Sequence, residues 1–197
     1  MKMGNYQIGR RWLSESQLVS ESPENVADKA IEKAVGTRDT FLTGESVKNS
    51  KMKKLFVGDR PLDLANQAVD DLIAKQDEIG KDLTDDDGNI LDPKLKKQAE
   101  AALKPARGKI FSVILNASRG KIFYDIAVIG NKAQAKKMSQ IFLSALSSAL
   151  SGVSLGEEKV KREGDQSKSG SELATLSDHP FLSDAWFIES EIPFTIE

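Results

Sequence analysis

The chain has 197 residues, 39% hydrophobic and 29% charged, with 28 Lys or Arg against 30 Asp or Glu and no cysteine. This length suffices for the core of one domain, and the lack of cysteine excludes a disulfide framework, a thiolate zinc site and a cysteine nucleophile. No apolar run approaches the ~20 residues of a membrane span, so we expect no membrane association and a cytoplasmic location.

Four segments have the spacing of amphipathic helices. The first follows Ser22 and Pro23, a capping residue and a first-turn proline, and ends before Gly36. The others end near Gly80, Pro105 and Gly152, residues that stop a helix. We therefore predict helices over 23–35, 62–79, 93–104 and 132–150.

Two β-rich runs lie on either side of the segment 116–120 and predict a hairpin over 108–129. Further short strands are expected near the N-terminus, at 55–57 and at 153–155. Residues 156–178 contain almost nothing apolar, which favours a mobile loop. The last block alternates apolar and polar residues around Pro193, and proline in a strand favours the edge of a sheet.

These elements predict an α+β fold, with an antiparallel, hairpin-containing sheet covered on one face by amphipathic helices. We expect a main domain over 1–155 and a flexible loop or linker over 156–184. Residues 185–197 would form a C-terminal edge strand that packs back on the domain.

Candidate catalytic and metal sites fail on spacing. The aspartates around Asp87 and Gly88 would place Leu83 first and Lys94 twelfth in a calcium-binding loop, where acidic ligands are needed. The single histidine, His179, lies in a predicted turn with no nucleophile motif beside it. Glycine-rich phosphate loops are missing too. We expect no catalysis, no metal and no cofactor.

The strongest signal is charge. Residues 93–137 carry eleven Lys or Arg against two acids, a net charge of +9, while the rest of the chain carries −11. Such separation creates a local positive field that attracts a polyanion. Nine of these residues come from a helix, the hairpin and the next helix, and are predicted to meet on one nucleic-acid-binding surface: Lys94, Lys97, Lys104, Arg107, Lys109, Arg119, Lys121, Lys132 and Lys136.

Three aromatic residues lie among these charges. Phe111, Phe123 and Tyr124 would suit stacking on single-stranded bases if they were exposed. Their positions in predicted strands favour the core for Phe111 and Phe123.

In order, these pieces resemble the recombination-associated RdgC family. The similar segments are Asn5 to Ile8 with Leu13 to Leu18, Asp77 to Leu83, Lys97 to Ala106, and Gly120 to Val153, where Gly-x-x-x-x-Asp-x-Ala precedes Lys132-Ala133 and a helix. The resemblance implies a nucleoid-associated homodimer that binds double-stranded DNA with little sequence preference. The family's homodimers are ring-shaped and its members are longer, with the additional portion contributing to ring closure, so the resemblance does not extend to a closed ring for this chain.

We therefore predict a non-enzymatic, homo-oligomeric protein that binds DNA, double-stranded DNA in particular, without sequence preference. Two alternatives fit the same charge separation. One is a phage-type structural or assembly protein whose basic and acidic surfaces contact neighbouring subunits. The other is an inhibitor that occupies a DNA-binding protein with its acidic face.

Overall fold

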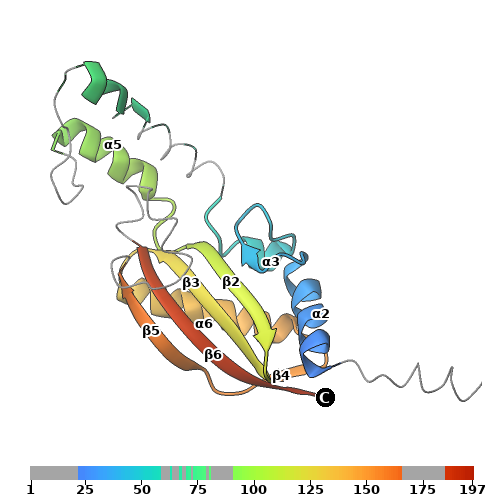
Figure 1. Ribbon diagram of the computed structural model, residues 1–197. Coiled ribbons are helices and arrows are strands. Elements are labelled where there is room, and N and C mark those ends of the chain that lie inside the picture. The colour runs from blue at the N-terminus through green and yellow to red at the C-terminus, as the bar shows by residue number, and fades with distance from the viewer. Residues whose placement is uncertain are drawn as a thin grey trace, which may run out of the picture.

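A six-stranded antiparallel sheet forms the centre of the computed structural model, which describes residues 22–58, 63, 67, 70–71, 73–78, 80, 91–165 and 185–197 (Figure 1). The strand order is β1-β2-β3-β6-β4, and β5 also pairs with β6. The strands are β1 (Phe41–Leu42), β2 (Ile110–Ser118), β3 (Lys121–Ile129), β4 (Val153–Leu155), β5 (Lys159–Asp165) and β6 (Ala185–Ile196). The predicted α+β class is confirmed.

The two helices nearest the sheet have clear local start signals. Helix α2 (Pro23–Val35) begins where the Ser22 side chain accepts a hydrogen bond from the Asn25 amide, and ends at Gly36 in the left-handed region. Helix α6 (Lys132–Ala149) begins with a capping box between Asn131 and Gln134. Both match their predicted ranges to within one residue.

The core lies between one face of the sheet and these helices. Figure 1 shows α6 running behind the strands, with α2 beside it. Tyr124 of β3 packs near Phe142 of α6, and Phe142 in turn meets Phe56 in an edge-to-face contact with ring centroids 6.4 Å apart. All three side chains are at most 2% exposed. Burial of such large rings is the main stabilising contribution at this interface.

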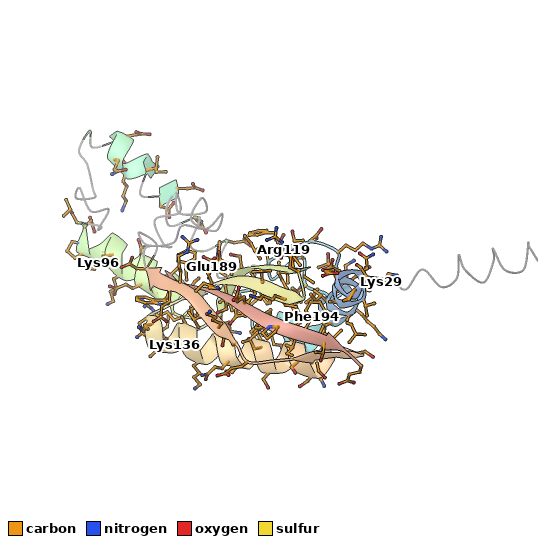
Figure 2. The ribbon with its side chains drawn as sticks, turned by 60° about the horizontal axis from the view of Figure 1, so that its bottom comes forward. Lys29, Lys96, Arg119, Lys136, Glu189 and Phe194 are labelled. Atoms are coloured by element: carbon orange, nitrogen blue, oxygen red, sulfur yellow. The ribbon has the colours of Figure 1, made fainter. Side chains whose placement is uncertain are left out.

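Helix α5 (Pro93–Leu103) extends beyond one end of the sheet. In Figure 2, Lys96 of α5 and Lys29 of α2 lie toward opposite ends of the molecule. Helix α5 confirms the predicted helix 93–104 to within one residue. Of the predicted helix 62–79, the described residues 63, 67, 70–71 and 73–78 are helical, and the others lie outside the described residues. The predicted N-terminal strand, the turn around Asp87 and His179 also lie outside the described residues.

The C-terminal strand is interior, which corrects the prediction of an edge strand over 185–197. β6 pairs with β3 on one side and with β4 and β5 on the other. Pro193 lies opposite Lys121 in the β3 register. On its other side it falls between the β4 and β5 registers, where its carbonyl accepts a hydrogen bond from the Gly156 amide at 2.8 Å.

The range predicted as a flexible loop, 156–184, contains strand β5 at Lys159–Asp165. Its backbone pairs with β6, and Arg162 forms an ion pair with Glu189 at 2.7 Å. Backbone pairing and ion pairs do not need apolar side chains, so hydropathy did not reveal this strand. Residues 166–184 lie outside the described residues.

Candidate nucleic-acid interface

The hairpin separates the nine predicted site residues into two groups. Arg119 and Lys121 lie at the turn between β2 and β3, where the Gly120 amide donates to a carboxylate oxygen of Glu24 on α2 at 3.2 Å. The others lie at or beyond the opposite end of the hairpin. Strands of nine residues hold the two ends about 30 Å apart. Arg119 and Lys121 therefore do not gather with the other seven residues.

A backbone network joins three distant segments at the far end. The Ile110 amide donates to the Leu55 carbonyl at 2.9 Å, and the Val57 amide donates to the Ile110 carbonyl at 2.8 Å. Gly108 then donates to the Ile129 carbonyl at 2.6 Å. Segments 55–57, 108–110 and the end of β3 are thereby held side by side.

The basic side chains of these segments form what we call the basic end. Nζ of Lys109 donates to the carbonyl of Lys54 at 3.0 Å, which places the two residues together. The α6 N-terminus follows β3 within three residues and adds two more lysines. The basic end comprises Lys54, Lys104, Arg107, Lys109, Lys132 and Lys136; all are exposed except Lys109, which is half-buried.

Glu163 of β5 offsets part of this charge. Lys132 and Lys136 contact its two carboxylate oxygens at 2.6 and 3.1 Å. The hydrogen bond from Lys132, and that from Lys136, hold the pKa of Glu163 below its ordinary value despite desolvation. Lys132 also lies 5.9 Å from the Trp186 ring centroid. These ion pairs therefore reduce the outward field of Lys132 and Lys136.

Lys121 is engaged elsewhere. It contacts Glu191 of β6 at 3.0 Å, and Lys161 of β5 reaches the same carboxylate oxygen at 2.9 Å. Hydrogen bonds from Lys161 and Lys121 lower the pKa of Glu191. This three-residue cluster connects β3, β6 and β5 across the open face of the sheet. The arrangement indicates a structural role for Lys121.

Helix α5 carries two more predicted site residues away from the sheet. Lys94 and Lys97 are exposed, and the Lys94 amide donates to the Asp92 side chain at 2.8 Å, which marks the start of the helix. The residue following α5, Lys104, belongs to the basic end, so the helix continues the basic surface outward.

The three aromatic residues do not form a stacking platform at the basic end. Tyr124 is 1% exposed and lies in the core, so the idea that it stacks on bases is wrong. Phe111 is half-buried against Ala127 and Phe187. Phe123 is half-buried and lines a cavity of about 550 Å³ on the open face, together with Asp125, Arg162 and Glu189. Phe111 also packs against Val57, Ala106 and Ile129, so its ring is used in local packing.

Sequence reasoning missed Lys54. The cluster Lys51, Lys53 and Lys54 was visible as a charge signal, but it lies about fifty residues before Lys109. Only the pairing of Phe56 with Ile110 brings it to the basic end.

The comparisons with known proteins show no relative: no family model, no curated protein and no solved structure matches the chain. The resemblance to RdgC proteins therefore rests on sequence patterns alone. Within the described part of the chain, no group of three or more His, Asp or Glu side chains is placed to hold a metal ion, and no helix is long and apolar enough to cross a membrane.

Proposed function

We propose that this protein binds nucleic acid without sequence preference, through the basic end and the outward lysines of α5. The observation that carries the proposal is that the backbone network brings Lys54 beside the basic segment 104–109, which follows it by about fifty residues and contains Lys104, Arg107 and Lys109. Four cationic side chains at one end of the sheet match the chemistry of a phosphate backbone.

The expected energetics follow from counterion release. Each phosphate neutralised by a lysine or arginine releases condensed cations, so affinity falls as salt rises. With four to six phosphate contacts, the slope of log K against log salt is expected near −4 to −5 for duplex DNA. Contacts of this kind position a protein on the backbone and carry no base information.

The RdgC-like role deepens this proposal. The sequence resemblance favours double-stranded DNA, a homo-oligomer and action in recombination at the nucleoid in the cytoplasm. Occupancy of DNA without catalysis would then be the mechanism by which the protein acts.

The test compares two variants that each remove two positive charges. Arg107→Ala/Lys109→Ala changes the basic end, and Arg119→Ala/Lys159→Ala removes exposed charges elsewhere. We expect the first to make the salt slope shallower by about two and the control to leave it near the unmodified value. Binding would be measured with labelled random duplex and single strand across a salt titration.

An equal change of the salt slope in both variants would reject the basic end as the binding site and indicate a diffuse electrostatic attraction. Binding by neither duplex nor single strand at low salt would reject the proposed function. The molecular size of the protein, measured in the same samples as a function of salt and protein concentration, would show whether it forms the expected homo-oligomer.

A further inference from the structure

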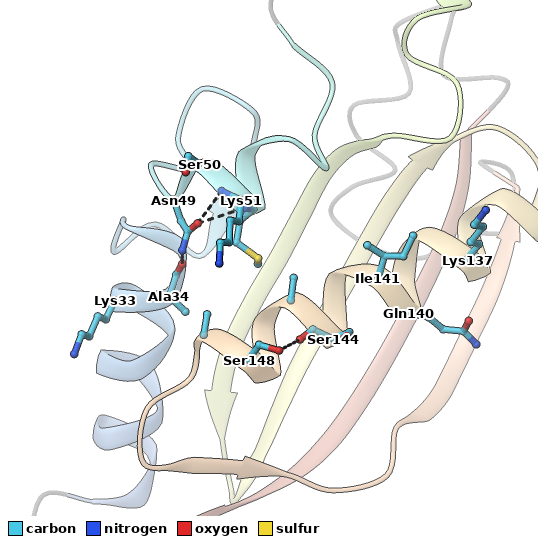
Figure 3. A pocket seen from close by; sticks show the side chains of 13 residues that line it. Lys33, Ala34, Asn49, Ser50, Lys51, Lys137, Gln140, Ile141, Ser144 and Ser148 are labelled. Atoms are coloured by element: carbon cyan, nitrogen blue, oxygen red, sulfur yellow. Dashed lines mark hydrogen bonds between the residues drawn. The ribbon is translucent and has the colours of Figure 1, made fainter.

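A groove of about 900 Å³ lies on the outer side of α6, away from the sheet (Figure 3). Its walls come from the end of α2, from α3 (Ser50–Lys53) and from α6 between Lys137 and Ala149. That stretch of α6 is about 18 Å long at 1.5 Å per residue. The groove is therefore long enough for about three turns of a helix.

The lining separates charge from apolar surface. Lys33, Lys51 and Lys137 come from three different helices, and no carboxylate residue is among the residues that line the groove. The apolar part consists of Ala34, Met52, Ile141, Ala145 and Ala149. Ile141 is 39% exposed, although large aliphatic side chains are usually buried.

The polar groups of the groove are poor ligands for a bare anion. The Ser148 hydroxyl donates to the Ser144 carbonyl at 2.8 Å, and the Asn49 amide donates to the Ala34 carbonyl at 2.8 Å (Figure 3). The side-chain oxygen Oδ1 of Asn49 accepts hydrogen bonds from the Lys51 and Met52 amides. The hydroxyl of Ser148 and the side-chain amide of Asn49 are therefore already bonded within the protein. The three lysines remain as the groups that can attract a charged ligand.

The groove also differs from a nucleic-acid site. None of its lining residues is aromatic, so bases have no stacking platform, and none is arginine, the residue best suited to bidentate phosphate contact. An apolar floor with cations around it suits a helix that has one apolar face and acidic flanks.

We propose that this groove docks an acidic amphipathic helix of a partner protein. Its apolar face would cover Ile141 and Ala145, and its Asp or Glu side chains would pair with Lys33, Lys51 and Lys137. The groove shares no residue with the basic end, but it adjoins it, since Lys137 follows Lys136 on α6 and Lys51 lies three residues before Lys54. We expect one molecule to hold a nucleic acid and a protein partner at the same time.

The probe is a synthetic helical peptide of about four turns with Leu on one face and Glu on its flanks. One control peptide has the same composition in an order that abolishes the apolar face, and another carries Lys in place of Glu. Binding would be followed by fluorescence anisotropy, and contacts by backbone amide shifts of the labelled protein. We expect binding of the first peptide alone, with shifts centred on 141–149.

Two variants test the groove. Lys51→Glu/Lys137→Glu is expected to weaken peptide binding by about tenfold or more, because like charges then face the Glu flanks. The matched control Arg119→Glu/Lys159→Glu reverses two exposed charges elsewhere and is expected to change it less than about twofold. Ile141→Gln, at an exposed position, should lower the affinity for the peptide without altering duplex binding.

Equal binding of the rearranged peptide, or equal losses in the two reversal variants, would overturn the proposal. The proposal would also be overturned if duplex DNA displaced the peptide and the Lys51→Glu/Lys137→Glu variant lost affinity for the duplex. The groove would then belong to the nucleic-acid surface. Duplex binding lost only in Arg107→Ala/Lys109→Ala leaves the two sites independent.

Discussion

The hydroxyl of Tyr124 donates a hydrogen bond to a carboxylate oxygen of Glu158, and this contact ties the middle of β3 to the segment between β4 and β5. The same carboxylate oxygen accepts from the Ser190 hydroxyl at 2.8 Å, and the Tyr124 oxygen also contacts the Ser139 hydroxyl of α6 at 2.8 Å. The buried hydroxyl therefore connects two strands, β3 and β6, and the segment between β4 and β5 to α6. Buried polar clusters of this kind stabilise a fold only when every member has a partner.

The first prediction removes that hydroxyl. Tyr124→Phe is expected to lower the free energy of unfolding by about 1–3 kcal/mol, because the oxygens of Glu158 and Ser139 lose a partner in a low-dielectric site. Denaturant unfolding measures the change. A double-mutant cycle with Glu158→Gln should give a coupling energy above about 0.5 kcal/mol. A coupling near zero would mean that the ring, and not its hydroxyl, stabilises this region.

The second prediction concerns high pH. Burial, and then the hydrogen bond to Glu158, raise the pKa of Tyr124 well above its ordinary value of about 10. The folded protein therefore retains this proton at pH values where the unfolded chain releases it. The associated stability is present in full below pH ~10 and is lost as pH rises above that value.

Absorbance can isolate this titration, because Tyr6 and Tyr124 are the two tyrosines of the chain. In a Tyr6→Phe background, the tyrosinate signal reports Tyr124 alone. We expect it to appear at higher pH in the native protein than in denaturant. Overlapping titration curves would contradict the buried hydrogen bond.

The third prediction uses Glu163 to adjust the charge of the basic end. Glu163→Gln releases Lys132 and Lys136 from an ion pair, so duplex affinity at low salt is expected to rise about two- to fivefold. The matched change Glu189→Gln acts on the pair with Arg162, away from the basic end, and should alter affinity less. A fall in affinity on Glu163→Gln would show that Glu163 positions the two lysines for binding.

The fourth prediction follows from the lowered pKa of Glu163. A carboxyl group with a depressed pKa in the folded state stabilises the protein above its unfolded pKa of about 4.3, and this contribution is lost as pH falls through the folded pKa. The stability difference between the unmodified protein and Glu163→Gln should therefore be present at neutral pH and shrink below pH ~4. Urea unfolding at both pH values measures it.

The fifth prediction compares two glycines with positive φ. At Gly36, φ is 82° and an added Cβ would lie 2.8 Å from the Lys48 Cβ, whereas at Gly152, φ is 72° and nothing lies within 4 Å of an added Cβ. Gly36→Ala is expected to cost about 1–2 kcal/mol of folding stability, more than Gly152→Ala, which tests backbone strain alone. The two variants would be compared by thermal or denaturant unfolding. An equal loss of stability in both would mean that the segment around Lys48 moves aside without cost.

The sequence alone determined the elements whose signals are local. The Ser22 cap and Gly36 define α2, the Asn131 cap defines the start of α6, and the β-rich runs beside Arg119 and Gly120 define the hairpin. Caps, helical periodicity and tight turns act over a few residues, so they can be read along the chain. The charge separation was also visible in this way.

The tertiary structure decided everything that joins distant residues. It placed β6 inside the sheet, paired the polar segment 159–165 with it, moved Lys54 beside Lys109, and separated Arg119 and Lys121 from the other predicted site residues. Strand pairing and ion pairs depend on which segments meet in space, and a linear pattern of charge or hydropathy carries no record of those partners.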